Sequence, residues 1–144
     1  MTVAVMPVQL STEWVAVGAM HLQEVRGAQS WVALPGAPPH LPGVVAWRGR
    51  AIAVLDLGGL LGIAPPVQPG DSRARMLIAQ VDTTAFAIPV DTVREVHTVA
   101  KVEDTHATQL RLAQGQVEIA GQVMPVVDLA LALAAVTGAD GEAR

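Results

Sequence analysis

The sequence contains no cysteine, no tyrosine and a single phenylalanine, and these absences already narrow its function. Without cysteine the chain forms no disulfide, offers no thiolate to a metal and has no thiol nucleophile. Aromatic residues make up only 3% of the chain, so its interior must be built from aliphatic side chains. Because β-branched residues are favoured in strands, this composition predicts a mainly β fold.

Positive charge is also scarce. Nine Lys and Arg residues against 13 Asp and Glu residues give a formal net charge of −4, whereas nucleic-acid-binding proteins carry a basic surface. No apolar run reaches the roughly 18 residues that a membrane helix needs, and residues 1–12 lack the positive charge of a secretion signal. We therefore expect a cytoplasmic protein with no nucleic-acid partner and no direct membrane insertion.

Motifs for catalysis and metal binding are missing as well. No glycine-rich phosphate loop occurs, and no serine lies in a Gly-x-Ser-x-Gly elbow. The four histidines lack the spacing of a metal site, and the acidic residues beside His97 and His106 are better interpreted as solvated loop charges. We expect no catalytic residue, no metal and no cofactor, and hence no enzyme.

Short apolar runs of strand length, separated by turn residues, dominate the rest of the chain. Two proline-rich segments, 34–43 and 64–72, are predicted to be surface loops. The predicted helical segments are a short turn at 21–25 and a terminal helix at 129–136. The predicted strands cover residues 3–10, 14–17, 44–47, 50–55, 75–81, 85–89, 116–120 and 122–127.

An internal repeat organises these segments. Residues 49–57 match 121–129 at an offset of 72, and residues 9–25 match 80–96 at an offset of 71. We infer a unit of two hairpins that ends in an Asp-Leu step into a helical turn and that occurs twice. Because one unit is too small to be stable alone, the two should pack together, with a groove for a partner between them.

Two aspartates, Asp56 and Asp128, occupy equivalent positions of this repeat. One interpretation is that each caps the helical turn that follows its strand. The other is a carboxylate pair that serves a small hydrolase together with a histidine. A duplicated cap keeps its role more readily than a duplicated active site, so the repeat favours the caps.

Binding rather than catalysis is suggested by the turn at Arg48 and Gly49, which would hold a guanidinium on a rigid tip between two apolar strands. From the residues alone, an ordinary exposed hairpin arginine is the simpler interpretation. Trp47 beside it is either a core residue or an interface anchor. Leu22 and Glu24 alone indicate no more than an amphipathic turn.

The order of these segments resembles the CheW family. The segment 22–25 (LQEV) is followed by 42–49 (PGVVAWRG), 53–57 (AVLDL), 86–96 (FAIPVDTVREV) and 121–129 (GQVMPVVDL). The sequence departs from the family where Ala46 replaces the usual Asn, Trp47 replaces Leu and Ala53 replaces Pro. These departures suit a divergent paralogue from a pilus or gliding pathway as well as a flagellar one. The agreement with the family lies at Gly43, Val44, Arg48, Gly49, Val54, Asp56 and Leu57.

The resemblance implies a single domain at 2–136, with a disordered tail at 137–144. Its fold would be two small SH3-like, five-stranded β-barrel subdomains packed together, with short helices and a C-terminal helix. The implied function is a non-catalytic adaptor that binds the cytoplasmic tip of methyl-accepting chemoreceptors and the regulatory domain of a CheA-type histidine kinase. Such an adaptor is cytoplasmic and is recruited to receptor arrays at the inner membrane. The alternative is a generic β-barrel interaction module outside chemotaxis. The implied partner-binding residues are Leu22, Glu24, Gly43, Arg48, Gly49 and Val90.

Overall fold

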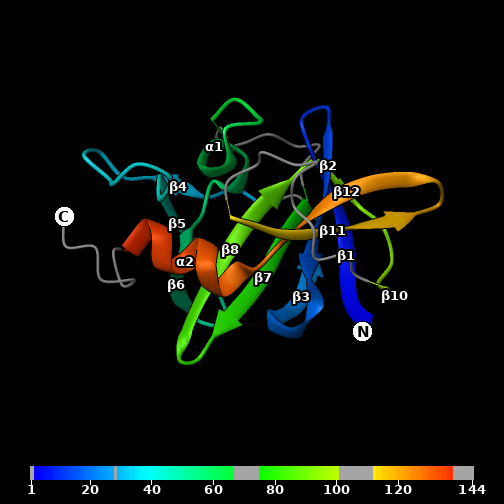
Figure 1. Cartoon of the computed structure of the whole chain (residues 1–144). Helices are drawn as coiled ribbons and strands as arrows, with labels where there is room; N and C mark the ends of the chain where they lie inside the picture. Colours follow the sequence, from blue (N-terminus) through cyan, green and yellow to red (C-terminus); the bar gives the residue numbers. More distant parts are fainter. Residues whose placement is uncertain (1, 28, 67–74, 101–111, 138–144) are drawn as a thin grey trace.

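The computed structural model describes residues 2–27, 29–66, 75–100 and 112–137 (Figure 1). Most of these residues lie in two six-stranded sheets, so the predicted mainly β fold with two β subdomains is confirmed. Neither strand ladder closes into a complete ring within the described residues, and the predicted barrels are therefore open. The predicted terminal helix is present as α2 (Leu129–Thr137). Residues 138–144 of the predicted tail lie outside the described residues.

The two sheets, here named sheet A and sheet B, divide the chain between them: sheet A combines strands from both ends of the chain, and sheet B is formed by its middle part. Sheet A has the order β10-β1-β2-β12-β11, and β9 also pairs with β1. Its strands are β1 (Thr2–Leu10), β2 (Glu13–Gly18), β9 (Thr92–Val93), β10 (His97–Ala100), β11 (Ala113–Ile119) and β12 (Gln122–Val127). Sheet B has the order β3-β7-β8-β6-β5-β4. Its strands are β3 (Leu22–Arg26), β4 (Val32–Ala33), β5 (Gly43–Trp47), β6 (Arg50–Val54), β7 (Arg75–Val81) and β8 (Thr84–Val90).

The sequence repeat appears in the backbone pairing, but the repeats exchange hairpins. In sheet A the parallel pair of β2 and β12 places Ala16 opposite Val126. The equivalent residues Ala87 and Val54 face each other in the parallel pair of β8 and β6 in sheet B. Each sheet thus takes one hairpin from each repeat, and the expectation that each contiguous unit forms its own subdomain is wrong. Parallel strands need a long connection, which only segments distant in sequence can supply.

The predicted helical turn at 21–25 is also wrong. His21 ends a short 3₁₀ helix, η1 (Ala19–His21), and the next residues form the strand β3. Antiparallel pairing with β7 satisfies the backbone of this segment, which a single helical turn would leave largely unbonded. Its side chains alternate between half-buried and exposed, as in a strand with one covered face.

Other differences concern short or marginal elements. The strands β4, β9 and β10, of two to four residues, were not predicted. Gly43, assigned to a proline-rich loop, is the first residue of β5. Thr137, assigned to the tail, ends α2, and its hydroxyl donates a hydrogen bond to the Leu133 carbonyl at 2.9 Å. Residues 67–72 of the second predicted loop lie outside the described residues.

The main core lies between the sheets and joins them into one packed unit. Its buried aliphatic residues come from both sheets and from the helices α1 (Leu57–Leu61) and α2, with the fully buried Phe86 among them. A smaller cluster of sheet B contains Trp31 and Trp47, and another of sheet A contains Val5 and Met124. The predicted aliphatic interior is therefore confirmed, and only a few aromatic rings fill it.

Candidate functional site

The turn between β5 and β6 presents Arg48 in an unusual backbone conformation. Arg48 has a φ of 49° and Gly49 a φ of 78°, so both residues lie in the left-handed region. Such a turn matches the twist of a two-residue hairpin. Glycine adopts this conformation freely, whereas for arginine it costs about 1–2 kcal/mol. The arginine therefore occupies a position where local backbone energetics would favour glycine or asparagine.

The Arg48 guanidinium reaches across to the edge strand β3. Its Nη2 lies 3.4 Å from Oε1 of Glu24, and Nε of Arg26 lies 3.5 Å from Oε2 of the same carboxylate. The Arg48 side chain is 68% exposed and that of Glu24 is 32% exposed. Ion pairs with this much solvent contact contribute about 0–1 kcal/mol to stability. Their main effect is to orient the three side chains on one surface.

Trp47 lies beneath this surface rather than on it. The ring is 4% exposed and belongs to the core of sheet B, which decides between the two predicted roles in favour of the core. The guanidinium carbon of Arg48 lies 4.7 Å from the ring centroid, and that of Arg50 lies 5.7 Å from it. Both distances are within the range of cation–π contacts. The Trp47 ring thus lies within cation–π distance of two arginine side chains.

The remaining predicted residues lie at different places. A side chain at Gly43 would lie 2.0 Å from the Val32 carbonyl oxygen, so this glycine permits the close approach of β4 to β5. Leu22 is half-buried and packs against the main core. Val90 is 3% exposed, at the end of β8. Among the six predicted residues, the structure brings Glu24 into contact with Arg48, next to Gly49.

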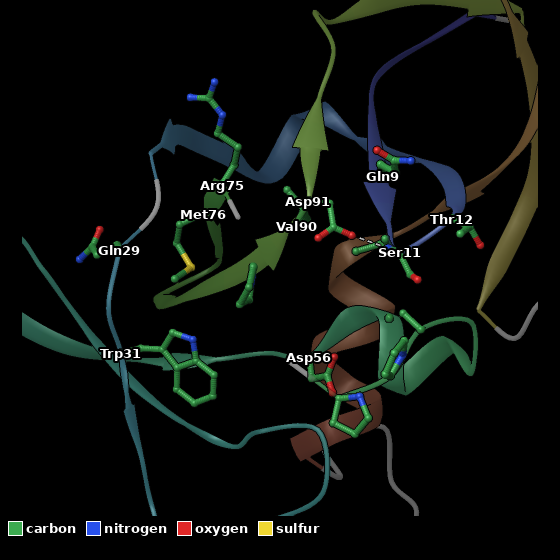
Figure 2. Close-up of a pocket in the computed structure, with 16 residues that line it drawn as sticks. Gln9, Ser11, Thr12, Gln29, Trp31, Asp56, Arg75, Met76, Val90 and Asp91 are labelled. Atoms are coloured by element: carbon green, nitrogen blue, oxygen red, sulfur yellow. Dashed lines mark hydrogen bonds between the residues drawn. The ribbon is translucent and has the colours of Figure 1, made fainter. Parts of the chain in front are cut away.

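A pocket of about 600 Å³ lies between the two sheets (Figure 2). Figure 2 shows Trp31 and Met76 on one side of it and Ser11 and Asp91 on the other. The Asp91 carboxylate accepts a hydrogen bond from the Ser11 backbone N–H and so connects the end of β8 to the β1–β2 turn. Of the six predicted partner-binding residues, Val90 alone lines this pocket. Its lining comprises Gln9, Leu10, Ser11, Thr12, Gln29, Trp31, Asp56, Gly58, Ala64, Pro65, Pro66, Arg75, Met76, Pro89, Val90 and Asp91.

The two repeat aspartates act as helix caps, as predicted. Oδ1 of Asp56 accepts a hydrogen bond from the Gly59 N–H at 3.1 Å, at the start of α1. Oδ1 of Asp128 accepts from Ala130 at 2.8 Å and from Leu131 at 3.3 Å, at the start of α2.

The hydrolase alternative requires these aspartates and a histidine to converge in one pocket. Asp56 lines the pocket between the sheets, and it also lines a second pocket, of about 550 Å³, together with His40. Asp128 lines neither of these two pockets. Neither of these two pockets therefore brings both aspartates and a histidine together.

Metal binding and membrane insertion find no support in the described ranges. No group of three or more His, Asp and Glu residues there could hold a metal ion. The residues Glu103, Asp104 and His106 lie outside those ranges. Each helix of the described part is too short to cross a membrane.

Two arginines near Arg48 and Glu24, namely Arg26 and Arg50, were not predicted from the sequence. Arg26 lies two residues after Glu24, and residues at that spacing share one face of a strand. Because this segment was predicted to be a helical turn, Glu24 and Arg26 were not expected to share a face. Arg50 is the cross-strand partner of Trp47 in the hairpin, and this pairing follows directly from the two-residue turn, which was predicted.

The chain is similar to known proteins in both sequence and structure. The family model described as CheW-like domain matches residues 4–133. A "Probable chemotaxis protein CheW" of Rhizobium etli is 33% identical over 85 residues, which are 58% of this chain and 52% of that protein. The chain thus spans about half of that relative. A "Chemotaxis protein CheW" of Rhizobium meliloti is 28% identical over 122 residues, 78% of this chain and 76% of the relative.

A solved structure shares the fold. The crystal structure of the scaffolding protein TtCheW from Thermoanaerobacter tengcongensis superposes with a TM-score of 0.74 at 20% identity, covering 88% of this chain and 89% of that one. At this level of identity the likeness concerns the fold, with its two β subdomains.

Proposed function

The chain belongs to the CheW-like family, and from this premise we propose that it is a non-catalytic adaptor coupling chemoreceptors to a histidine kinase. Its partners are the cytoplasmic tip of methyl-accepting chemoreceptors and the regulatory domain of a CheA-type kinase, in chemotaxis or a related chemosensory pathway. The observation that carries the proposal is the contact between Arg48 and Glu24 on the surface of a domain with this fold. Nη2 of Arg48 lies 3.4 Å from Oε1 of Glu24, and the arginine is presented by a turn in the left-handed conformation. The same turn thus fixes the direction in which the Arg48 side chain leaves the hairpin.

Each residue of the binding site has a distinct role in this proposal. Arg48 and Glu24 contact a partner directly, and Gly49 allows the turn that holds Arg48. Gly43 keeps the hairpin against β4. Leu22 and Val90 are proposed to lie at the groove between the sheets, since Leu22 packs against the main core and Val90 belongs to it.

The absence of catalysis and the location belong to the same proposal. Asp56 and Asp128 are engaged as caps, which supports a structural role for the only repeated carboxylates at strand exits. The protein acts in the cytoplasm and joins receptor arrays at the inner membrane, since both partners present their binding surfaces there. The domain spans residues 2–136.

Calorimetry with a cognate receptor tip and a CheA regulatory domain tests this function. The wild-type protein is expected to bind both, and Arg48→Glu to weaken at least one complex about tenfold or more, because it reverses an anchoring charge. Arg94→Glu is the matched control, since it makes the same change of charge at an exposed arginine that lies 4.2 Å from the Trp14 ring in sheet A. A wild-type protein that binds neither partner contradicts the proposal. Binding to unrelated proteins instead would favour the generic interaction module.

A further inference from the structure

The pocket between the sheets lies at the opposite end of sheet B from the turn that presents Arg48. The strand β6 begins directly after that turn and ends at Val54, two residues before Asp56, which lines the pocket. The two sites are therefore separate. The pocket has a volume of about 600 Å³, which is the size of a small-molecule site.

Asp56 places a buried negative charge at this pocket. Among the described residues it is the one charged side chain that is almost fully buried, at 4% exposed. Its Oδ1 caps α1, whereas its Oδ2 accepts no hydrogen bond from any described residue. A Cβ at Gly59 would lie 2.5 Å from Oδ2, so the glycine leaves space beside this oxygen. Because a buried carboxylate oxygen without a donor is unfavourable, the site favours a positively charged donor.

The other charged groups of the pocket agree with this polarity. Asp91 also lines the pocket, and it adds a second carboxylate. Arg75, the one positive side chain among the described residues of the lining, is exposed. Figure 2 shows its guanidinium directed away from both aspartates. The interior of the pocket is therefore negative.

The wall across from the two aspartates is apolar. Trp31 and Met76 lie there in Figure 2, and both are buried. Trp31 packs closely on Gly43, because a Cβ at Gly43 would lie 2.7 Å from its ring. A tryptophan held in this way offers a fixed surface to an aromatic group of a ligand. The pocket thus combines a buried carboxylate with an aromatic wall.

We propose that this pocket binds a small arylalkylamine, with its ammonium group on Asp56 and its aromatic ring against Trp31. The ammonium group donates a charge-assisted hydrogen bond to Oδ2, the oxygen that the helix cap does not use. A carboxylic acid of the same shape would bring like charges together, and an alcohol would lose the ion pair. This site goes beyond the adaptor function, and it binds its ligand whether or not the chain also binds a receptor or a kinase.

Calorimetry on the full chain tests the chemical class of the ligand. The probe is phenethylamine, and phenethyl alcohol and hydrocinnamate share its phenylethyl body. The amine is expected to bind about tenfold more tightly than the alcohol, and the acid more weakly than both. Equal affinity for the amine and the alcohol would overturn the proposal. Tighter binding of the peptide acetyl-Gly-Lys-Gly-amide would assign the pocket to a lysine of a protein partner and would overturn it as well.

A matched pair of variants tests the role of Asp56. Asp56→Asn is expected to weaken phenethylamine binding about tenfold, because it removes the charge while asparagine can still cap the helix. Asp128→Asn makes the same change at the equivalent cap, which lines neither pocket, and should leave the affinity unchanged. The probe should raise the Tm of wild type and of Asp128→Asn more than that of Asp56→Asn. Equal affinities of the two variants would contradict the assignment.

Nuclear Overhauser effects locate the bound probe. We expect contacts from the phenyl protons to the Trp31 ring and the Met76 methyl group. Asp56 also lines the second pocket, so contacts to Leu34 and His40 instead would overturn the choice of pocket. If the probe binds as expected but neither chemosensory partner does, the adaptor function fails and this site stands.

Discussion

Two hairpin turns of this protein have nearly the same backbone and present different chemistry. Arg48-Gly49 in sheet B has φ values of 49° and 78°, and Ala120-Gly121 in sheet A has 53° and 79°. The two turns are related by the repeat offset of 72. The first holds a guanidinium over a tryptophan, whereas the second holds only a methyl group.

The neighbours of the two turns differ in the same way. Trp47 corresponds to Ile119, and Arg50 corresponds to Gln122. The caps that follow, Asp56 and its counterpart, are conserved within the chain in type and in hydrogen bonding. The repeat has therefore kept the positions that fold the backbone, while the tryptophan and the two arginines occur in only one copy.

The largest expected effect concerns the placement of the hairpin that carries Arg48. Gly43→Ala should lower the free energy of unfolding by about 3 kcal/mol, because a Cβ there meets the Val32 carbonyl at 2.0 Å and the Trp31 ring at 2.7 Å. Urea unfolding measures the loss. Gly27→Ala is the control, since a Cβ at Gly27 has no described atom within 4 Å. Equal stability of the two variants would show that β4 can move away from the hairpin freely.

The caps should behave alike in the two copies. Asp56→Ala and Asp128→Ala are each expected to cost about 1 kcal/mol, the usual effect of losing a side-chain helix cap. Chemical denaturation of both variants checks this. If only one of them loses stability, the repeated aspartates do not share a structural role.

The smallest expected effect concerns the turns themselves. Ala120→Gly should raise the free energy of unfolding by about 0.5 kcal/mol, because glycine relieves the left-handed conformation but is more flexible in the unfolded chain. Arg48→Gly should gain less, since it also removes the contacts with Glu24 and Trp47. Thermal unfolding compares the pair. A larger gain at Arg48 than at Ala120 would mean that those contacts contribute nothing to stability.

Much of the fold follows from the sequence because the signals are local. Alternating apolar runs, two-residue turns and capping aspartates predicted both hairpin pairs that form the repeat, and the repeat itself indicated two related halves. The exchange of hairpins between repeats could not be predicted from local signals, since it depends on parallel pairing of β2 with β12 and of β6 with β8. Local patterns predict that a strand forms, but they do not indicate which distant strand it pairs with.

The site was predictable to a similar extent. Arg48 stood out because a tight turn presents it, and the family resemblance then indicated Glu24. The contact between them depends on β3, a strand that forms only because β7 offers an edge about 50 residues away. Arg26 could be identified as a neighbour of Glu24 only once β3 was known to be a strand.

The most direct test of the account is to move the arginine from one turn to the other. The double variant Arg48→Ala with Ala120→Arg keeps composition, net charge and turn geometry, and its affinity for the receptor tip and the kinase domain is measured by calorimetry. We expect the same loss of binding as for Arg48→Ala alone, because the turn in sheet A lacks the tryptophan and the second arginine. Affinity restored to the wild-type level by Ala120→Arg would contradict this expectation.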